Sequence, residues 1–264
     1  MRMGSEDISG WATMIDTVIG NIDRPFVHRA VVMESTQSTQ DSALRFAAGR
    51  PGLVLVASEQ TKGRGSRGRE WDDGNRGTLP CSFVIDHGEK TIPLLSACVA
   101  CVVHETLSSV LPASVDLRIK WPNDIVVVED DAVHKVAGIL IEIRDGLAVI
   151  GIGINCTREK RAWPGTLQHK AIALSQLGVQ VSRLHLVCRL IEHLSQWSAA
   201  CDQRVIKGYY LHYDAMVGRF HRFRYDGQCF EGIVEHIDPL ESISLQTEQG
   251  AVLLPIAQTT HERT

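Results

Sequence analysis

Residues 63–71 combine the residue types that bind anions. The segment reads Gly-Arg-Gly-Ser-Arg-Gly-Arg-Glu-Trp, with three glycines and three arginines in nine positions. Glycine lets main-chain amides approach an anion, and arginine offers a planar fork of donors to a carboxylate or a phosphate. A solvated basic loop would have a similar composition, but Trp71 follows directly and should anchor one end. A P-loop fits poorly, because Arg69 and Glu70 stand where a lysine and a hydroxyl are required.

Three further segments place polar residues at the ends of apolar runs. Residues 120–124 read Lys-Trp-Pro-Asn-Asp, a stiff corner that a plain turn would also explain. Residues 135–142 read Lys-Val-Ala-Gly-Ile-Leu-Ile-Glu. A carboxylate in such an apolar strand is costly, so Glu142 must face solvent, pair with a cation or belong to a functional site. Gly138 inside this strand indicates close approach of a ligand or another backbone. Residues 151–155, Gly-Ile-Gly-Ile-Asn, lack the third glycine and the helix of a dinucleotide fingerprint.

The pattern of apolar residues predicts the elements that position these segments. Dense strands that follow a helix favour an α+β fold, a mixed sheet covered by helices. The predicted strands are residues 26–33, 53–57, 79–85, 116–120, 125–128, 136–144 and 148–154. The predicted helices are residues 11–19, 42–48, 94–111 and 184–197. We expect three parts: an extension over 1–26, a ligand-binding domain over 27–212, and a small antiparallel barrel over 213–264.

Length and composition are those of a folded soluble protein. The chain has 264 residues, of which 44% are hydrophobic and 22% charged. Its net charge of −4 does not favour nucleic-acid binding. The apolar run 92–103 is too short to cross a bilayer, and the first twenty residues lack the continuous apolar stretch of a signal peptide. Seven scattered cysteines do not resemble a secreted disulfide framework, so we expect a cytoplasmic protein.

No set of metal ligands stands out in the sequence. Cys98 and Cys101 form an isolated pair inside a predicted apolar helix, where core packing is the better interpretation. The eleven histidines show no ligand-like spacing. We therefore expect no metal site built from protein side chains alone.

Taken in order, the four segments resemble the biotin protein ligases. The resemblance extends from residue 27 to the end of the chain and is most specific over 58–155. It implies a catalytic domain of the type found in class II aminoacyl-tRNA synthetases, followed by an SH3-like barrel. It also implies that biotin and ATP, with Mg²⁺, form biotinyl-5′-adenylate. Biotin would then pass to one lysine of the biotin carboxyl carrier domain of acetyl-CoA carboxylase or another biotin-dependent carboxylase.

The resemblance assigns roles to individual residues. Lys135 and Arg64 are the implied catalytic residues, because they match the cations that meet the carboxylate and the α-phosphate. The implied biotin-binding residues are Ser38, Thr39, Gln40, Gln60, Gly63, Arg64, Gly65, Lys135 and Gly138. The implied nucleotide-binding residues are Arg67, Arg69, Trp71, Lys120, Asn123, Asp124, Gly153 and Asn155. Ser35-Thr36-Gln37 competes with Ser38-Thr39-Gln40 in this alignment, and Asp41 and Ala43 favour the second. Trp163 is a candidate for covering the adenine.

Ser66 departs from the family pattern, which has arginine at this position. Loss of a guanidinium from an enclosed site costs about 2 to 4 kcal/mol of transition-state stabilisation. We therefore expect slower formation or faster release of the adenylate, partly offset by Arg67 or Arg69.

Two other functions remain as alternatives. A lipoate or octanoate ligase or transferase shares the superfamily, although the tryptophan in residues 120–124, the arginine-rich loop and the predicted barrel favour biotin. A nucleic-acid-binding protein would explain the basic loop, but only about 26 residues precede the catalytic region, so we expect no repressor function. The sequence leaves open whether the chain forms a homodimer, for which an edge strand such as 136–144 would serve.

Overall fold

The computed structural model describes residues 6–74, 76–88, 90–130, 132–158, 163–165, 167, 170–200 and 202–262. The first five residues of the expected extension and the last two of the expected barrel lie outside this set. Within it, no helix is both long enough and apolar enough to cross a membrane.

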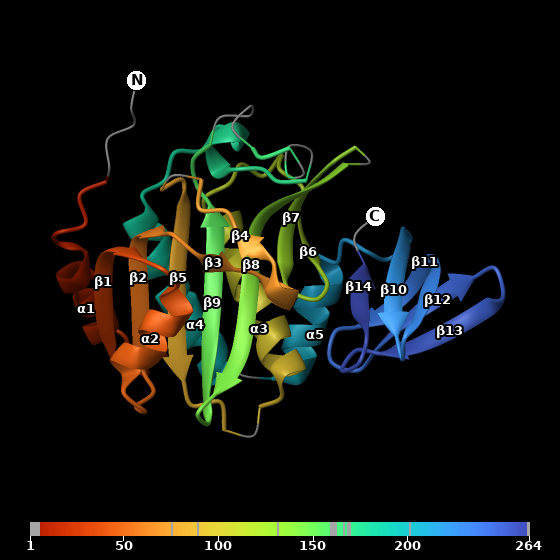
Figure 1. Ribbon diagram of the computed structural model, residues 1–264, viewed down its shortest axis with the longest axis horizontal. Helices are drawn as coiled ribbons and strands as arrows, with labels where there is room; N and C mark the ends of the chain where they lie inside the picture. Colours follow the sequence, from red (N-terminus) through yellow and green to blue (C-terminus); the bar gives the residue numbers. More distant parts are fainter. Residues whose placement is uncertain are drawn as a thin grey trace.

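A mixed sheet of seven strands forms the centre of the molecule (Figure 1). Its order is β1-β2-β5-β9-β8-β7-β6, in which β1 and β2 are parallel and the other neighbours are antiparallel. The strands are β1 Arg29–Thr36, β2 Leu53–Gln60, β5 Thr78–Ile85, β6 Leu117–Lys120, β7 Asp124–Glu129, β8 Ala132–Arg144 and β9 Leu147–Asn155. The central strands β2, β5 and β9 are almost wholly buried, as their continuous apolar runs require.

Helices cover both faces of this sheet (Figure 1). The helices are α1 Trp11–Gly20, α2 Thr39–Ala47, α3 Ile92–Ser108, α4 Arg183–Ala200 and α5 Gln203–His212. Helices α3 and α4 bury one face in the larger core cluster, and α1 packs beside them on β1 and α4. Helix α2 covers the other face over a smaller cluster that includes Leu55 and Val149. On the same face, Gln40 of α2 lies against Gly151 and Trp71 lies against Gly153.

The glycine- and arginine-rich segment 63–71 contains short regular pieces. Strands β3 Gly63–Arg64 and β4 Glu70–Trp71 pair as a hairpin, closed by the 3₁₀ turn η1 Ser66–Gly68. Arg67 in this turn has φ of 62°, a left-handed conformation in which the chain reverses direction. The hairpin lies across the α2 face of the sheet and brings Arg64 and Trp71 over β8 and β9 (Figure 1).

The C-terminal residues form a second sheet of five antiparallel strands, in the order β13-β12-β11-β10-β14. Its strands are β10 Phe220–Tyr225, β11 Gln228–Asp238, β12 Ser242–Thr247, β13 Gly250–Pro255 and β14 Thr260–Glu262. The fold class predicted from sequence is confirmed, with one refinement. The order leaves β13 and β14 at opposite ends, so in the described residues hydrogen bonding does not close the expected barrel.

The prediction that residues 136–144 form an edge strand is largely wrong. Strand β8 pairs with β9 along 137–144 and with β7 along 132–138, so it lies inside the sheet. Only residues 140–144 extend beyond β7, and in the described residues they pair with β9 alone. The edges of the sheet are β1 and β6.

Candidate functional site

Two adjoining cavities lie under the β3–β4 hairpin. The first is about 480 Å³ and is bounded by the start of α2, the end of β2, and the middle of β8 and β9. The second is bounded by the hairpin and by the segment that follows β9. The two share a wall made of Gly65, Ser66, Trp71 and Lys135. The arrangement offers two neighbouring compartments with one cationic side chain between them.

Thr39 and Gln60 form a hydrogen-bonded pair in the first cavity. The backbone N–H and the hydroxyl of Thr39 both donate to Gln60 Oε1, at 2.7 and 2.9 Å. Because a backbone N–H can only donate, this contact fixes which end of the Gln60 amide is the oxygen. The opposite end of this amide is therefore Nε2, a group with two N–H donors, and Ser82 holds the Thr39 hydroxyl by donating to it at 2.8 Å. Such donors suit a neutral carbonyl or amide ligand.

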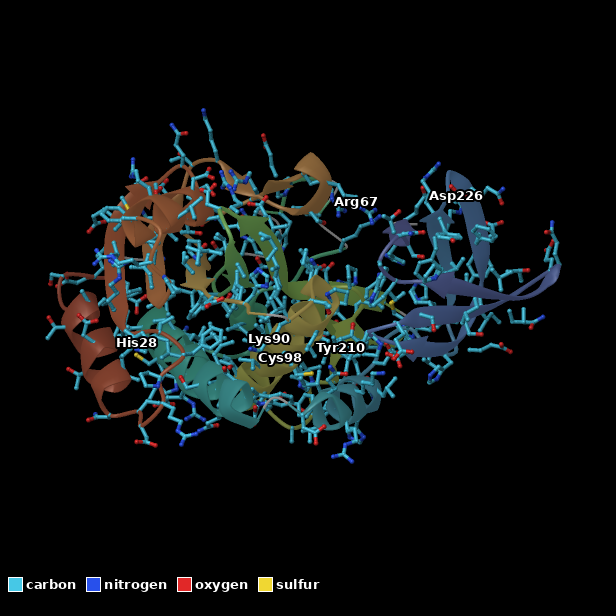
Figure 2. The ribbon with its side chains drawn as sticks, turned by 90° about the horizontal axis from the view of Figure 1, so that it is seen from below. His28, Arg67, Lys90, Cys98, Tyr210 and Asp226 are labelled. Atoms are coloured by element: carbon cyan, nitrogen blue, oxygen red, sulfur yellow. The ribbon has the colours of Figure 1, made fainter. Side chains whose placement is uncertain are left out.

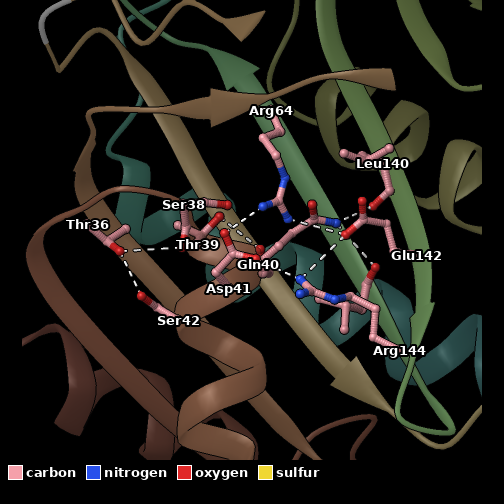
Figure 3. Close-up of polar contacts among 12 residues, drawn as sticks. Thr36, Ser38, Thr39, Gln40, Asp41, Ser42, Arg64, Leu140, Glu142 and Arg144 are labelled. Atoms are coloured by element: carbon pink, nitrogen blue, oxygen red, sulfur yellow. Dashed lines mark hydrogen bonds and ion pairs between the residues drawn. The ribbon is translucent and has the colours of Figure 1, made fainter. Parts of the chain in front are cut away.

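Gln40 connects helix α2 to the sheet. Its Nε2 donates to the carbonyl oxygens of Leu140 and Val149, at 2.9 and 3.3 Å (Figure 3). A Cβ on Gly151 would lie 3.0 Å from the Gln40 amide carbon, so the glycine makes room for this side chain. Gln40 lines the cavity, but both of its donors hold the start of α2 in place.

Lys135 lies on the shared wall, between Asp124 and the indole of Trp71. Its Nζ forms an ion pair with Asp124 Oδ1 and lies 5.2 Å from the Trp71 ring centroid. Gly138 and Gly153 face each other on β8 and β9. A Cβ on either would lie 2.6 Å from the Lys135 Nζ or from the Trp71 ring, respectively. These two glycines therefore provide the space in which the ammonium and the indole lie.

Arg64 is held by two carboxylates at the mouth of the first cavity (Figure 3). Its guanidinium lies 2.5 Å from Asp41 Oδ2 and 3.3 Å from Glu142 Oε2. Arg144 contacts the other oxygen of Asp41, at 2.7 Å. Desolvation opposes ionisation of Asp41, but its hydrogen bonds to Arg64 and Arg144 prevail and lower its pKa. Glu142, costly in an apolar strand, is thus paired with cations, as one of the alternatives from sequence required.

The remaining arginines of the loop point in different directions. Arg69 donates from Nη2 to the Ser66 hydroxyl at 2.7 Å and from Nε to the Ser66 carbonyl at 3.0 Å, and it lines the second cavity. Arg67 instead donates to the carbonyl oxygen of His261 in the C-terminal sheet, at 3.0 Å (Figure 2). Of the two arginines expected to compensate for Ser66, only Arg69 lies beside it.

The second cavity contains acidic, basic and aromatic groups. Asn155 ties β8 to the segment that follows β9, donating from Nδ2 to the carbonyls of Lys135 and Ile172, both at 3.1 Å. Arg158 pairs with Asp72 at 2.9 Å and lies 4.3 Å from the Trp163 ring. Trp163, the candidate from sequence for covering an adenine, lines this cavity.

Asp73 is the strongly perturbed carboxyl near the site. It is buried, and this burial raises its pKa to about 6, against the lowering effect of hydrogen bonds from Thr78, Arg76 and Gln60. These bonds tie the end of the loop after β4 to the start of β5 and the end of β2. The hydrogen bonds of Asp73 therefore help to position the loop beside the site, and proton binding to its carboxyl can change them.

Most of the residues predicted from sequence come together around these cavities. Those that line the first are Ser38, Thr39, Gln40, Gln60, Arg64, Gly65, Trp71, Asn123, Asp124, Lys135, Gly138 and Gly153. Those that line the second are Gly65, Arg69, Trp71, Lys135 and Asn155. Asn123 and Asp124, expected on the nucleotide side, thus line the compartment expected for biotin.

Three predicted residues lie outside both cavities. Arg67 contacts the C-terminal sheet. Lys120 ends β6 close to the same sheet, where burial lowers the pKa of His221 and the charge of Lys120 adds to the effect. Gly63 lies behind Gln60 and Trp71, where a Cβ would come within 2.6 Å of the Trp71 carbonyl oxygen. It supports the wall and does not line it.

Sequence reasoning missed several lining residues, among them Glu70, Asp72, Leu167, Lys170 and Ala171. Asp72 directly follows the basic loop, so the residue types that identified the loop could also have indicated Asp72. Lys170 and its neighbours follow β9 without a motif, and their place depends on backbone hydrogen bonds between Lys135 and the 170–172 segment.

Comparisons with known proteins agree on one family. Residues 30–158 match the biotin/lipoate A/B protein ligase family. The chain is 29% identical to the biotin–[acetyl-CoA-carboxylase] ligase of Mycobacterium tuberculosis, over 88% of each protein. It is also 29% identical to the ligase of the same name from Paracoccus denitrificans, over 86% of this chain and 98% of that one. Its fold is similar to that of a biotin protein ligase from Aquifex aeolicus solved with biotin and ATP, with a TM-score of 0.73, 23% identity, and coverage of 89% of this chain and 99% of that one.

Proposed function

Residues 30–158 of this chain belong to the biotin/lipoate A/B protein ligase family, and from this membership we propose that the protein is an ATP-dependent biotin ligase. Its substrates are biotin, ATP and a lysine of a biotin carboxyl carrier domain, such as that of acetyl-CoA carboxylase. The names of the two relatives of similar length support this acceptor.

The observation that carries the proposal is the position of Lys135 on the wall shared by the two cavities. Two anions must meet there, the biotin carboxylate and the α-phosphate of ATP, and their repulsion must be offset by fixed positive charge. The ion pair with Asp124 and the contact with Trp71 hold the ammonium between the two compartments. Arg64 supplies a second cation at the edge of the first cavity.

The reaction proceeds in two transfers. A carboxylate oxygen of biotin attacks the α-phosphorus, and the bond from phosphorus to the bridging oxygen breaks to release pyrophosphate. The neutral ε-amine of the acceptor lysine then attacks the acyl carbon, AMP leaves with the electron pair of the broken bond, and the new amide loses one proton. Lys135 and Arg64 stabilise the charge that builds on the phosphate and carboxylate oxygens in both steps.

We assign the first cavity to biotin and the second to the nucleotide. The Nε2 donors of Gln60 and the remaining acceptor capacity of the Thr39 hydroxyl suit the ureido group, which has a carbonyl and two N–H groups. Arg69, Trp163 and Asn155 would surround the adenosine and phosphate. The carboxylates of Glu70 and Asp72 on this side are oxygen donors of the kind that Mg²⁺ prefers, and the ion would shield the triphosphate.

Biotin-dependent exchange of labelled pyrophosphate into ATP tests the adenylation step. We expect exchange with biotin and none without it, and exchange with octanoate or lipoate in place of biotin would contradict the assignment. Lys135→Met should slow exchange by about 10²- to 10³-fold, because it removes the cation from the shared wall. Lys90→Gln, a half-buried lysine far from both cavities, should leave it unchanged.

Transfer needs a separate measurement. Incubation with biotin, ATP and an apo carrier domain should label one lysine, detected by mass spectrometry. A carrier in which this lysine is replaced by arginine should stay unlabelled. Adenylate formation without labelling of any carrier domain would reject the acceptor while leaving the adenylation step intact.

A further inference from the structure

A third cavity lies on the opposite side of the sheet, and the proposed reaction does not use it. It is about 890 Å³ and is bounded by the residues that precede β1 and β2, by the end of β5, and by helices α3 and α4. It shares no lining residue with the two cavities around Lys135. Strand β2 begins at this cavity and ends at Gln60, about 25 Å away at the usual rise per residue. A ligand here would therefore not contact the adenylation site.

The walls of this cavity are mainly apolar. Phe26 and Ile85 contribute from the sheet side, Leu95 and Val99 from α3, and Leu194 from α4. These residues belong to, or pack against, the larger core cluster, so the cavity is an opening into the hydrophobic interior. An apolar molecule that filled it would gain the free energy of leaving water without any rearrangement of polar groups.

The mouth of the cavity carries the cationic side chain of Lys90. Lys90 lines the cavity and is half-buried, and in the described part of the chain its ammonium makes no ion pair. Asp86 also lines the cavity; it is exposed, and its Oδ1 accepts a hydrogen bond from the N–H of Gly88 in its own turn. His28 and Ser198 complete the polar rim. Figure 2 shows the molecule from this side, with His28, Lys90 and Cys98 labelled.

We propose that this cavity is a second ligand site that binds an apolar monocarboxylate, with its hydrocarbon part among Phe26, Leu95 and Leu194 and its carboxylate on Lys90. A half-buried ammonium beside an apolar cavity complements an acid of this kind better than a neutral molecule, because pairing restores the charge stabilisation that partial burial removes. The same hydrocarbon chain in an ester lacks the charge, so the site distinguishes a free acid from an acyl group bound to a carrier.

Decanoate is the probe, and methyl decanoate is its uncharged counterpart. Isothermal titration of the full-length protein should show decanoate binding about tenfold more tightly than the ester. Lys90→Gln should remove this preference, while Arg50→Gln, an exposed cation next to the cavity residue Pro51, should leave it intact. Equal affinity of the two probes for the wild type, or no binding of decanoate, would overturn the proposal.

The location of binding needs its own readout. The thiol of Cys98 lines the cavity, whereas Cys229 is exposed on the C-terminal sheet. Decanoate should slow the reaction of Cys98 with N-ethylmaleimide and leave that of Cys229 unchanged, as followed by peptide mass spectrometry. Ser198→Trp should fill the mouth and abolish binding, while Gln196→Trp, on an exposed position of the same helix, should not. Protection of both thiols, or binding that survives Ser198→Trp, would contradict the site. None of these measurements depends on ATP or biotin.

Discussion

At the scale of single residues, the site combines a cation held in a fixed position with a serine at the position where the resemblance predicts an arginine. Lys135 is held by Asp124 and Trp71, and the uncharged Ser66 lies on the same shared wall. Arg69 reaches the same position from three residues away and donates twice to Ser66. The loop thus keeps a guanidinium beside the second cavity through two hydrogen bonds to Ser66.

The substitution Ser66→Arg tests the role of this position. Ser66→Arg should slow dissociation of the adenylate by at least about tenfold, because a second guanidinium would contact the phosphate. Arg69→Gln should have the opposite effect, since Ser66 then has no neighbouring charge to hold. Release of labelled biotinyl-5′-adenylate through a desalting column measures both rates. Equal release rates in wild type and Ser66→Arg would reject the role of this position.

The buried carboxyl of Asp73 makes stability depend on pH. Its pKa in the folded protein is raised to about 6 by burial, from 3.8, so the native state binds this proton more tightly than the unfolded state. Its contribution to the free energy of unfolding is therefore greatest at low pH and is lost as pH rises from about 4 to about 6, on the order of 3 kcal/mol in total.

Asp73→Asn should remove this loss, whatever its effect on absolute stability. Urea unfolding of both proteins at pH 4.5, 5.5 and 6.5 gives the comparison, because all other titrating groups are shared. The difference in unfolding free energy between variant and wild type should shift in favour of the variant as pH rises. A constant difference across this range would show that the carboxyl ionises normally.

At the scale of elements, strands β8 and β9 leave space for the indole of Trp71. Gly138 and Gly153 pair across β8 and β9, and Trp71 from the hairpin lies where their side chains would be. Gly153→Ala would place a methyl group 2.6 Å from the ring, so the indole or the strand must move. We expect a loss of about 1 to 3 kcal/mol of stability and a raised KM for ATP.

Gly208→Ala is the matched control for this prediction. Gly208 lies in α5 with no other atom within 4 Å of the added Cβ, so the change should leave KM unaltered and slightly raise stability. Thermal unfolding and steady-state exchange assays measure both variants. An unchanged KM in Gly153→Ala would mean that Trp71 does not set the nucleotide compartment.

The elements were predictable from sequence where burial determined the residue types. Residues 53–57 are continuously apolar because β2 is covered on both faces, and this run was found. The polar ends of strands were not predicted. Ser35 and Thr36 belong to β1 because they pair with Glu59 and Gln60, and this pairing depends on the neighbouring strand. Helix α5 was also missed, since only Ile206 and Tyr210 of its ten residues are buried.

Some residues of the site were likewise predictable from the sequence, and others were not. Gly138 was predicted because a glycine inside an apolar strand indicates close approach of another group, whereas the role of Lys135 was implied only by the resemblance of the four segments to a family. The destination of Arg67 depends on a contact 194 residues away, and no local pattern encodes that contact. Edge strands could not be assigned either, because strand order is a property of the whole sheet.

At the scale of the whole molecule, one buried arginine joins the N-terminal extension to the core. Arg183 pairs with Glu6 at 3.0 Å and donates to the carbonyl oxygens of Ser58 and Thr78, at 2.9 and 3.3 Å. It also lies 5.5 Å from the ring of Trp11 in α1. The segment that begins the described chain is therefore packed onto the strands that lead to Gln60 and Asp73.

Arg183→Met should destabilise the protein by about 3 kcal/mol, because the carbonyl oxygens of two central strands lose their buried partner. Glu6→Gln should cost less than about 1 kcal/mol, since the Glu6 carboxylate is partly exposed. Urea unfolding at pH 7 measures both. Comparable effects of the two substitutions would mean that the ion pair, and not the contact with the strands, accounts for the role of Arg183.

The contact between Arg67 and His261 also affects how the two sheets cooperate. Arg64 and Arg67 are three residues apart, yet the first is anchored to α2 and β8 and the second to β14. The hairpin is therefore held at its first strand by Arg64 and at its turn by Arg67, so the central sheet and the small sheet both fix its position. A shift of β14 relative to the central sheet would be transmitted to Arg64 over only three residues of chain.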